Sequence, residues 1–420
     1  MLVYKFGGAS VQSADGVRNL SHILSLTNEK LFVVVSAMGK TTDGLERVLN
    51  CYMERNTQQA LAELTSIEHY HKNLIEELFF GKDTDKLHVF SLLEELKTFV
   101  EQTNPTDYDS DYDHIVAYGE LISTSIVSEY LNQNKSENTW LNMRKLLRTD
   151  SNFREANVQM NKSENLLRNA VNFGETEIYV AQGFIGGNAQ GKTTTLGREG
   201  SDYTAAIVAN LLNADSVTIW KDVPGILNAD PRIFPDTVLI PELSYYDAVE
   251  LSHSGAQVIH PKTIKPLENK HIKLYVKPFG DPNQAGSVIK DSTSAPIEVP
   301  VLILRRNQVL ITMRALDFSF VLEDSLSKIF IIFNKHRLKV SMIQSSAVTI
   351  SVCIDKVRNL ENALDELRNS FGVSFNENLE LLTIRGSNDD ICDQYTQGKT
   401  ILLSQKTRRT ARFLLKSDPT

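Results

Sequence analysis

The chain has 420 residues, of which 41% are hydrophobic and 23% are charged, and its formal net charge is -8. This length allows two or three domains with sizeable cores, and the acidic balance gives no reason to expect a nucleic-acid partner. Because apolar runs stay short of the roughly 18 residues of a membrane span and the N-terminus lacks the features of a signal peptide, we expect no membrane association and a cytoplasmic location.

The first predicted strand, Leu2 to Phe6, ends in a lysine and a pair of glycines before a helix that begins at about Ser13. Two glycines between a strand and a helix suit a phosphate that passes close to the backbone, and Lys5 supplies positive charge. An ordinary glycine turn beside an exposed lysine is the alternative.

The next run, Leu31 to Val35, is continuously apolar and β-branched, as in a strand buried on both faces of a parallel sheet. It leads into the hydroxyl-rich segment Ser36 to Asp43. Further on we expect a turn-rich polar linker from Thr103 to Asp113 and then a helix from His114 to Ser123. Its glycine, Gly119, costs helix stability, which suggests that another group packs closely against it.

The stretch GFIGGNAQGKTTTLGREGSD contains a match to the G-x-x-x-x-G-K-T nucleotide loop at Gly186 to Thr193. That motif requires a helix directly after the loop, whereas the residues that follow Lys192 are β-branched or broken by glycines. We therefore expect a hairpin here. The helix is expected to start later, capped by Ser201 or Asp202, which places G-R-E-G-S-D at a helix N-terminus where an anion could bind.

Another buried strand, Ser216 to Trp220, is followed by a loop that mixes turn formers with two cations. The proline of His260-Pro261-Lys262 suits the first turn of a helix, which would place Lys262 near a helix start. Strands alternate with helices to about residue 295, and the glycine-rich turns follow strand ends. This pattern predicts an α/β three-layer sandwich around a mainly parallel sheet, with the site at the carboxyl ends of its strands.

A proline-containing boundary separates this domain, residues 1–295, from a second region at 301–420. The second region reads as strand, helix, strand, strand, helix, strand, which is a ferredoxin-like unit spanning about 305–378. The remaining residues, about 379–416, supply strands and one short helical piece, Asp389 to Tyr395, so we expect a truncated second unit.

Metal ligation is not expected from the sequence. The three cysteines are far apart in sequence, and we read them as reduced, partly buried thiols. His69 and His71 are two residues apart in a helical stretch, whereas neighbours on a helix face are three or four apart. We therefore expect both histidines to lie on the surface.

Several motifs in order, KFGGAS, VVVSAMG, YGELIS, TTTLGREGSD, WKDVPGILNADPR and GAQVIHPKT, together resemble the aspartokinases of the amino acid kinase family. The resemblance covers essentially the whole chain and includes a C-terminal region of ACT type. It implies ATP-dependent phosphorylation of the side-chain carboxylate of L-aspartate with Mg²⁺, the first step towards lysine, threonine and methionine. A non-catalytic amino-acid sensor and a kinase for another amino acid such as glutamate are the alternatives.

The resemblance also assigns roles to residues. Glu120 would receive the α-amino group of aspartate, Arg198 would hold a substrate carboxylate, and Asp202 would organise the phosphate end. The catalytic residues implied are Lys5, Asp202 and Lys262. The substrate-binding residues implied are Ser36, Thr42, Glu120, Arg198 and Ser201. The ATP-binding residues implied are Lys5, Gly7, Gly8, Ser10, Lys221, Asp222, Leu227, Arg232 and Lys262.

The chemistry of the reaction agrees with these residue types. A substrate carboxylate is ionised at neutral pH and needs no general base, so catalysis should rest on positioning and on cations that stabilise the transferring phosphoryl group. We expect Arg198→Ala mainly to raise the aspartate KM, and Lys5→Ala mainly to lower kcat.

The sequence departs from the family pattern at a few positions. Ala9 replaces a threonine, and Lys221 and Pro224 alter the nucleotide loop. Ser341 stands where an acidic residue would meet an amino-acid inhibitor, which puts feedback inhibition by lysine or threonine in doubt. Because sheet edges of ACT type usually pair between chains, we expect a homodimer through residues 301–420.

Overall fold

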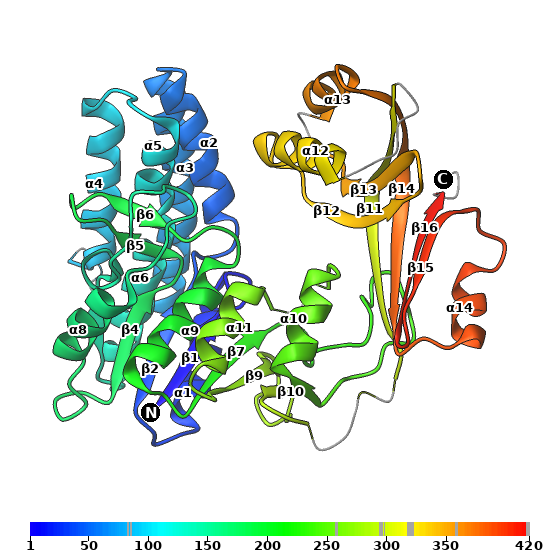
Figure 1. Cartoon of the computed structure of the whole chain (residues 1–420). Helices are drawn as coiled ribbons and strands as arrows, with labels where there is room; N and C mark the ends of the chain where they lie inside the picture. Colours follow the sequence, from blue (N-terminus) through cyan, green and yellow to red (C-terminus); the bar gives the residue numbers. More distant parts are fainter. Residues whose placement is uncertain are drawn as a thin grey trace. The chain divides into compact units, whose positions relative to one another are not determined.

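The computed structural model describes residues 1–81, 84, 86–256, 259–293, 297, 299–316, 323–357 and 360–416 (Figure 1). The chain divides into two compact units. The first contains Met1–Ile226, Leu239–Ser252 and Gln257–Ser294, and the second contains Leu227–Val238, His253–Ala256 and Ala295–Thr420. The boundary that the sequence predicts at residue 295 lies outside the described residues.

In the described part of the first unit, eight strands form one sheet in the order β3-β4-β2-β1-β7-β9-β10-β8. Neighbouring strands are parallel except for the antiparallel pair of β9 and β10. The mainly parallel sheet expected from the sequence is thus confirmed. The strands are β1 (Leu2–Phe6), β2 (Leu31–Val35), β3 (Thr139–Leu141), β4 (Ile178–Gln182), β7 (Ser216–Lys221), β8 (Glu242–Ser244), β9 (Lys273–Pro278) and β10 (Ser287–Lys290).

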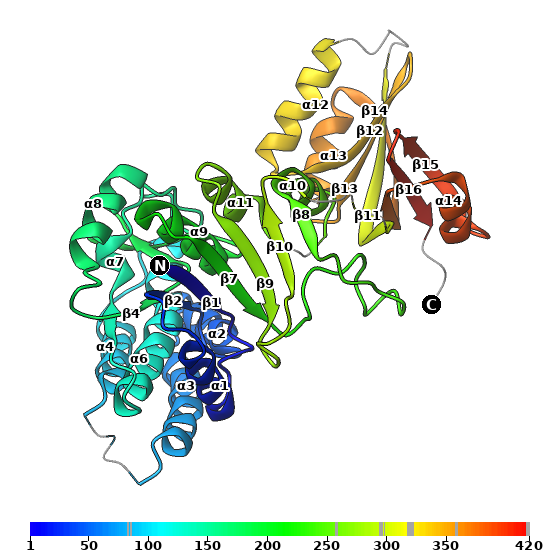
Figure 2. The ribbon, with the colours of Figure 1, turned by 90° about the horizontal axis from the view of Figure 1, so that it is seen from below.

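Helices cover both faces of this sheet, which explains why every residue of β2 is buried. Figure 2 shows α9 and α11 on one face and α1, α3 and α6 on the other. The helices are α1 (Ala14–Ser25), α2 (Thr41–Met53), α3 (Thr57–Leu78), α4 (His88–Gln102), α5 (Tyr108–Val116), α6 (Tyr118–Gln133), α7 (Met143–Leu146), α8 (Met160–Ala170), α9 (Gly200–Leu212), α10 (Tyr245–His253) and α11 (Pro261–Glu268).

The glycine-rich stretch forms the expected hairpin, in which β5 (Ile185–Gly187) pairs antiparallel with β6 (Thr193–Thr195). The apparent nucleotide loop is therefore the turn of a hairpin. The predicted cap of α9 is wrong, because this helix begins at Gly200 and its N-cap is Glu199, in the left-handed conformation at φ 54°. Ser201 and Asp202 lie in the first turn of the helix.

Two other local predictions are wrong because burial overrides polar sequence. The expected linker before Asp113 is helical from Tyr108, where the Asp107 side chain accepts a hydrogen bond from the Ser110 N–H and caps α5. His71 is completely buried. Its Nδ1 lies 2.8 Å from the carbonyl oxygen of Ile67, and burial lowers its pKa to about 4, so it is a neutral core residue.

The second unit contains the predicted order of strand, helix, strand, strand, helix and strand, which is confirmed. In the described part of this unit, six strands form an antiparallel sheet in the order β12-β13-β11-β14-β16-β15. The elements are β11 (Val301–Ala315), α12 (Glu323–Lys335), β12 (Val340–Ser345), β13 (Thr349–Asp355), α13 (Leu360–Arg368), β14 (Phe371–Arg385), α14 (Asp389–Thr396), β15 (Ile401–Lys406) and β16 (Thr410–Lys416).

The strands β11 and β14 run through both halves of this sheet. Their register shifts between Arg305 and Leu310, where Asn307 and Asn378 adopt φ values of 57° and 56°. The irregularity divides the ferredoxin-like half from the half that contains α14. Close to it, an Arg305 guanidinium N–H donates to the Ser341 hydroxyl at 2.8 Å. A cation thus stands beside the position where the resemblance implies an acidic residue.

Among the described residues, no helix is long and apolar enough to cross a membrane. Cys51, Cys353 and Cys392 are free thiols, and Cys353 and Cys392 are buried.

Candidate functional site

The site lies where neighbouring parallel strands end. The strands β4, β2, β1 and β7 are consecutive in the sheet, so the segments that leave them meet at one edge. Lys5 is the penultimate residue of β1, Ser36 follows β2, and Lys221 is the last residue of β7. The Ser36 N–H donates to the Phe6 carbonyl, which ties the ends of β1 and β2 together.

Lys5 and Asp202 form a buried ion pair at this edge, with 2.7 Å between Nζ and Oδ1. Burial by itself would raise the pKa of Asp202, but the charges of Lys5 and Lys221 outweigh it and hold this pKa below its usual value. Asp202 is therefore ionised at neutral pH and fixes the Lys5 ammonium at the edge of the sheet. Of the predicted site residues, the structure thus places Lys5, Asp202 and Lys221 close to one another.

Glu120 is buried in the first turn of α6, and its Oε1 accepts a hydrogen bond from the Ala37 N–H at 3.2 Å. Its other oxygen, Oε2, is buried without a hydrogen-bond partner among the described residues. Burial raises the pKa of Glu120 to about 8, although the Ala37 N–H and the Lys5 charge partly offset this effect. An unpaired carboxylate oxygen in such a place is suited to receive a cationic group.

Two glycines, Gly8 and Gly119, pack closely against Ala37, beside the Glu120 carboxylate. A Cβ at Gly8 would lie 2.4 Å from the Ala37 carbonyl oxygen, and a Cβ at Gly119 would lie 2.8 Å from the Ala37 Cβ. A side chain at either glycine would therefore displace Ala37, whose N–H donates to Glu120. The close packing expected from Gly119 is confirmed, and Gly8 serves backbone packing at the same point.

Arg198 and Lys262 are exposed, and neither side chain has a hydrogen bond or ion pair within the described part of the chain. Glu199, which sequence reasoning missed, connects their two loops because its Oε2 accepts the His260 N–H at 2.9 Å. Lys262 lies in the first turn of α11 after Pro261, as predicted. Gln257 and Val258, from the same motif, lie outside the described residues.

The remaining predicted residues of the first unit are polar groups at loop and helix starts. Ser10 and Ser201 are buried, Ser36 and Thr42 are half-buried, and Asp222 is exposed. Thr42 lies in the first turn of α2, whose N-cap residue, Lys40, makes no side-chain cap. Gly7 leaves its backbone partly exposed beside Lys5. Hydroxyls and open N–H groups of this kind are suited to bind anions.

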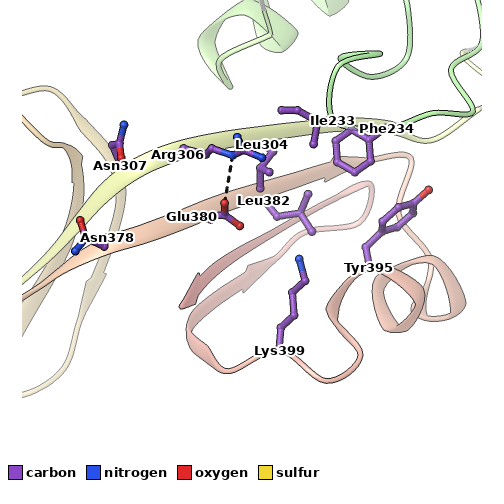
Figure 3. Close-up of a pocket in the computed structure, with 10 residues that line it drawn as sticks. All are labelled: Ile233, Phe234, Leu304, Arg306, Asn307, Asn378, Glu380, Leu382, Tyr395 and Lys399. Atoms are coloured by element: carbon purple, nitrogen blue, oxygen red, sulfur yellow. Dashed lines mark ion pairs between the residues drawn. The ribbon is translucent and has the colours of Figure 1, made fainter. Parts of the chain in front are cut away.

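Leu227 and Arg232 belong to the second unit, whereas the other predicted ATP-binding residues belong to the first. Arg232 is ion-paired with Asp230 at 2.7 Å. Residues of the same segment line a cavity of about 500 Å³ within the second unit (Figure 3), whose lining combines apolar with charged and amide side chains. Two of its lining residues, Arg306 and Glu380, form an ion pair with 3.4 Å between Nε and Oε1. The lining residues are Ile233, Phe234, Leu304, Arg306, Asn307, Asn378, Glu380, Leu382, Tyr395 and Lys399.

No group of three or more His, Cys, Asp or Glu side chains that could hold a metal ion is found among the described residues. The site of the first unit instead combines the cation Lys5, held by Asp202, with a carboxylate that has an unsatisfied oxygen and with helix starts. This set can bind one polyanion and one small zwitterion side by side.

Comparison with known proteins identifies the family. The amino acid kinase family model matches residues 1–278. The chain is 33% identical over 369 residues to the lysine-sensitive aspartokinase 3 of Escherichia coli (strain K12), covering 84% of this chain and 78% of that protein. It is 29% identical over 410 residues to the chloroplastic aspartokinase 2 of Arabidopsis thaliana, covering 92% and 74%.

Solved structures agree with the sequence matches. The crystal structure of E. coli aspartokinase III in complex with aspartate and ADP is similar with a TM-score of 0.84 and 28% identity, covering 99% of this chain and 96% of that chain. The same enzyme in complex with lysine and aspartate is similar with a TM-score of 0.80 and 29% identity over the same shares. Family model, sequence and structure together show that the chain belongs to the amino acid kinase family and, within it, to the aspartokinases.

Proposed function

We propose that the protein is an aspartate kinase that transfers the γ-phosphoryl group of ATP to the side-chain carboxylate of L-aspartate. The observation that carries this proposal is the unpaired, buried Oε2 of Glu120 at the edge where Lys5 and Asp202 are fixed. A carboxylate there favours a substrate with an ammonium group, and the nearby cations favour phosphate. The product, 4-phospho-L-aspartate, leads towards lysine, threonine and methionine.

We assign one group of residues to the binding of aspartate and another to the binding of ATP. Glu120 binds the α-amino group of aspartate. Arg198 binds a carboxylate of aspartate, because its guanidinium can donate two parallel hydrogen bonds to it. Lys5 stabilises the negative charge on the transferring phosphoryl group, and Asp202 keeps its ammonium in place. Substrate binding involves Ser36, Thr42 and Ser201 as well, and ATP binding involves Gly7, Gly8, Ser10, Lys221, Asp222, Leu227, Arg232 and Lys262.

The site is suited to bind Mg²⁺ together with the nucleotide. Mg²⁺ is usually held by one or two carboxylates together with substrate phosphates, and Asp202 is the ionised carboxylate at the phosphate end. When bound, the ion neutralises charge on the phosphates. The chain's own residues align the two substrates, whose mutual repulsion is the main obstacle to reaction.

The activity is tested by ADP release in the presence of L-aspartate, L-glutamate or no amino acid. We expect release that depends on L-aspartate and is at least about tenfold slower with L-glutamate, because one extra methylene displaces either the ammonium or the reacting carboxylate. Faster release with L-glutamate would indicate a kinase for that amino acid. Absence of amino-acid-dependent release would favour a sensor.

Arg198→Ala is expected to raise the aspartate KM by about 10- to 100-fold with a smaller effect on kcat, because this contact forms before the chemical step. The matched control is Lys192→Ala, which removes a cation from the hairpin turn of the apparent nucleotide loop. Lys192 is exposed, with its ammonium 5.8 Å from the centre of the Phe153 ring, and its loss should leave both KM values unchanged. Initial rates over a matrix of aspartate and ATP concentrations give both KM values. If Lys192→Ala raised the aspartate KM as much as Arg198→Ala, the assignment of Arg198 to aspartate binding would be contradicted.

We also propose a homodimer through residues 301–420. The edge strands of the described six-stranded sheet, β12 and β15, each lack a neighbouring strand on one side, and Phe330 and Ile331 of α12 are 45% and 65% exposed. Light scattering at micromolar concentration should give twice the chain mass. Ile331→Glu should shift the molecule towards the monomer, and a wild-type monomer would refute this assembly.

We also propose that the protein is located in the cytoplasm. The free thiols of Cys51, Cys353 and Cys392 are typical of a reducing compartment. Fractionation of cells that produce the protein would test the location.

A further inference from the structure

Asp113 is a completely buried carboxylate that sequence reasoning placed in a linker. It lies on α5, and its oxygens accept hydrogen bonds from two other segments of the chain. The Thr195 N–H donates to Oδ2 at 2.8 Å and the Thr195 hydroxyl lies 2.6 Å from Oδ1. The Arg154 N–H lies 3.1 Å from Oδ1 and 3.0 Å from Oδ2.

The Arg154 turn is held to α5 by its side chain as well. Arg154 has φ 67°, which is unfavourable for a residue with a Cβ. Its guanidinium forms an ion pair of 3.2 Å with Asp109 and lies 4.5 Å from the centre of the Tyr112 ring. The same turn contacts the hairpin, because the Ala156 N–H donates to the Thr195 carbonyl at 2.9 Å. Thr195 is therefore held from two sides.

Both neighbours of this junction belong to the aspartate site. Thr195 is the last residue of β6, and Arg198 follows three residues later. On the other side, α5 ends at Val116 and α6 begins at Tyr118, so Glu120 stands seven residues after Asp113 in a nearly continuous helical segment. One carboxylate thus connects the segment that carries Glu120 with the segment that carries Arg198.

We propose that Asp113 is a positioning residue that fixes the distance between Glu120 and Arg198, and with it the fit of the amino acid. This inference rests on the proposed roles of those two residues. Asp113 acts through Thr195 and the Arg154 turn.

The energetics indicate why a carboxylate occupies this position. Burial raises the pKa of Asp113 to about 6, while the hydrogen bonds from Thr195 and Arg154 and the Arg154 charge lower it. The protein thus tolerates a costly buried charge to satisfy three donors from two segments. An asparagine could still accept the two backbone N–H groups with its oxygen and donate its amide to the Thr195 hydroxyl, whereas an alanine would leave all three donors unpaired.

The test compares the kinetics of Asp113→Ala, Asp113→Asn and Thr195→Val. We expect Asp113→Ala to raise the aspartate KM about tenfold or more while the ATP KM changes less than about twofold, since a shift of about 1 Å in a binding group has effects of this order. Asp113→Asn should restore the aspartate KM to within about threefold of wild type. Thr195→Val, which keeps the backbone donor, should be intermediate, and it replaces Asp113→Ala if that variant does not fold.

Asp111→Ala is the matched control. Asp111 is also buried on α5 and accepts hydrogen bonds from the Thr106 N–H and hydroxyl, but Thr106 belongs to the loop before the same helix. Its loss should lower the thermal midpoint without a selective rise in the aspartate KM. Equal changes in both KM values for Asp113→Ala or Thr195→Val, or the same selective rise for Asp111→Ala, would overturn the proposal. A wild-type protein without aspartate-dependent activity would instead contradict the proposed function.

Discussion

Replacement of Glu120 by glutamine is expected to raise the aspartate KM by about 100-fold, with the ATP KM nearly unchanged. A hydrogen bond to a charged group is worth about 1.5–3 kcal/mol, and the loss of a buried charge partner costs more than this. The Glu120 Oε2 has no partner among the described residues, and in the proposed function the substrate ammonium is the group that satisfies it. Glutamine keeps the size of the side chain and an acceptor for the Ala37 N–H.

The same variant should change the pH dependence of aspartate binding. Burial raises the pKa of Glu120 to about 8, so the unliganded carboxyl group carries a proton below that pH. Binding of the ammonium requires loss of this proton, and the aspartate KM should therefore fall as the pH rises from about 6 to 8, by up to about tenfold per pH unit. In Glu120→Gln this slope should disappear. Steady-state kinetics across this range measure it, and an equal slope in both proteins would show that another group titrates.

Lys5→Ala is expected to lower kcat by about 10²- to 10³-fold, the range found when one donor that stabilises transition-state charge is removed. The Lys5 ammonium is fixed 2.7 Å from the Asp202 carboxylate and can act on developing charge without reorganisation. The aspartate KM should change much less, because the role proposed for Lys5 is on the phosphoryl group and not on aspartate.

Lys277→Ala is the control for loss of a positive charge in the same unit. Lys277 lies on β9, and its ammonium is 5.8 Å from the centre of the Trp220 ring on the neighbouring strand β7. Thermal midpoints of both variants must be compared with wild type, since removal of Lys5 takes away the ion-pair partner of the buried Asp202 carboxylate. A folded Lys5→Ala variant with wild-type kcat would exclude Lys5 from catalysis.

Local patterns predicted much of the architecture because they report burial directly. The apolar run of β2 indicated a strand covered on both faces, and the glycine-broken residues after Lys192 excluded the helix that a nucleotide loop requires. Gly119 indicated close packing, which the contact with Ala37 confirms. These are properties of short segments, and tertiary contacts do not override them here.

Residues whose importance depends on distant partners could not be found in this way. Asp113 stands among acidic residues that read as a solvated linker, and its value arises from Thr195, 82 positions away. His71 has a polar sequence context but faces the core. Glu199 caps no group of its own helix and contacts His260, so no local signal marks it.

We infer that this site phosphorylates an acid that it recognises by the ammonium group of that acid. The most direct measurement traps the acyl phosphate with hydroxylamine in the presence of ATP, Mg²⁺ and either L-aspartate or succinate, which lacks only the amino group. We expect ready formation of the hydroxamate from L-aspartate and little from succinate. No hydroxamate from L-aspartate, or equal amounts from both acids, would contradict it.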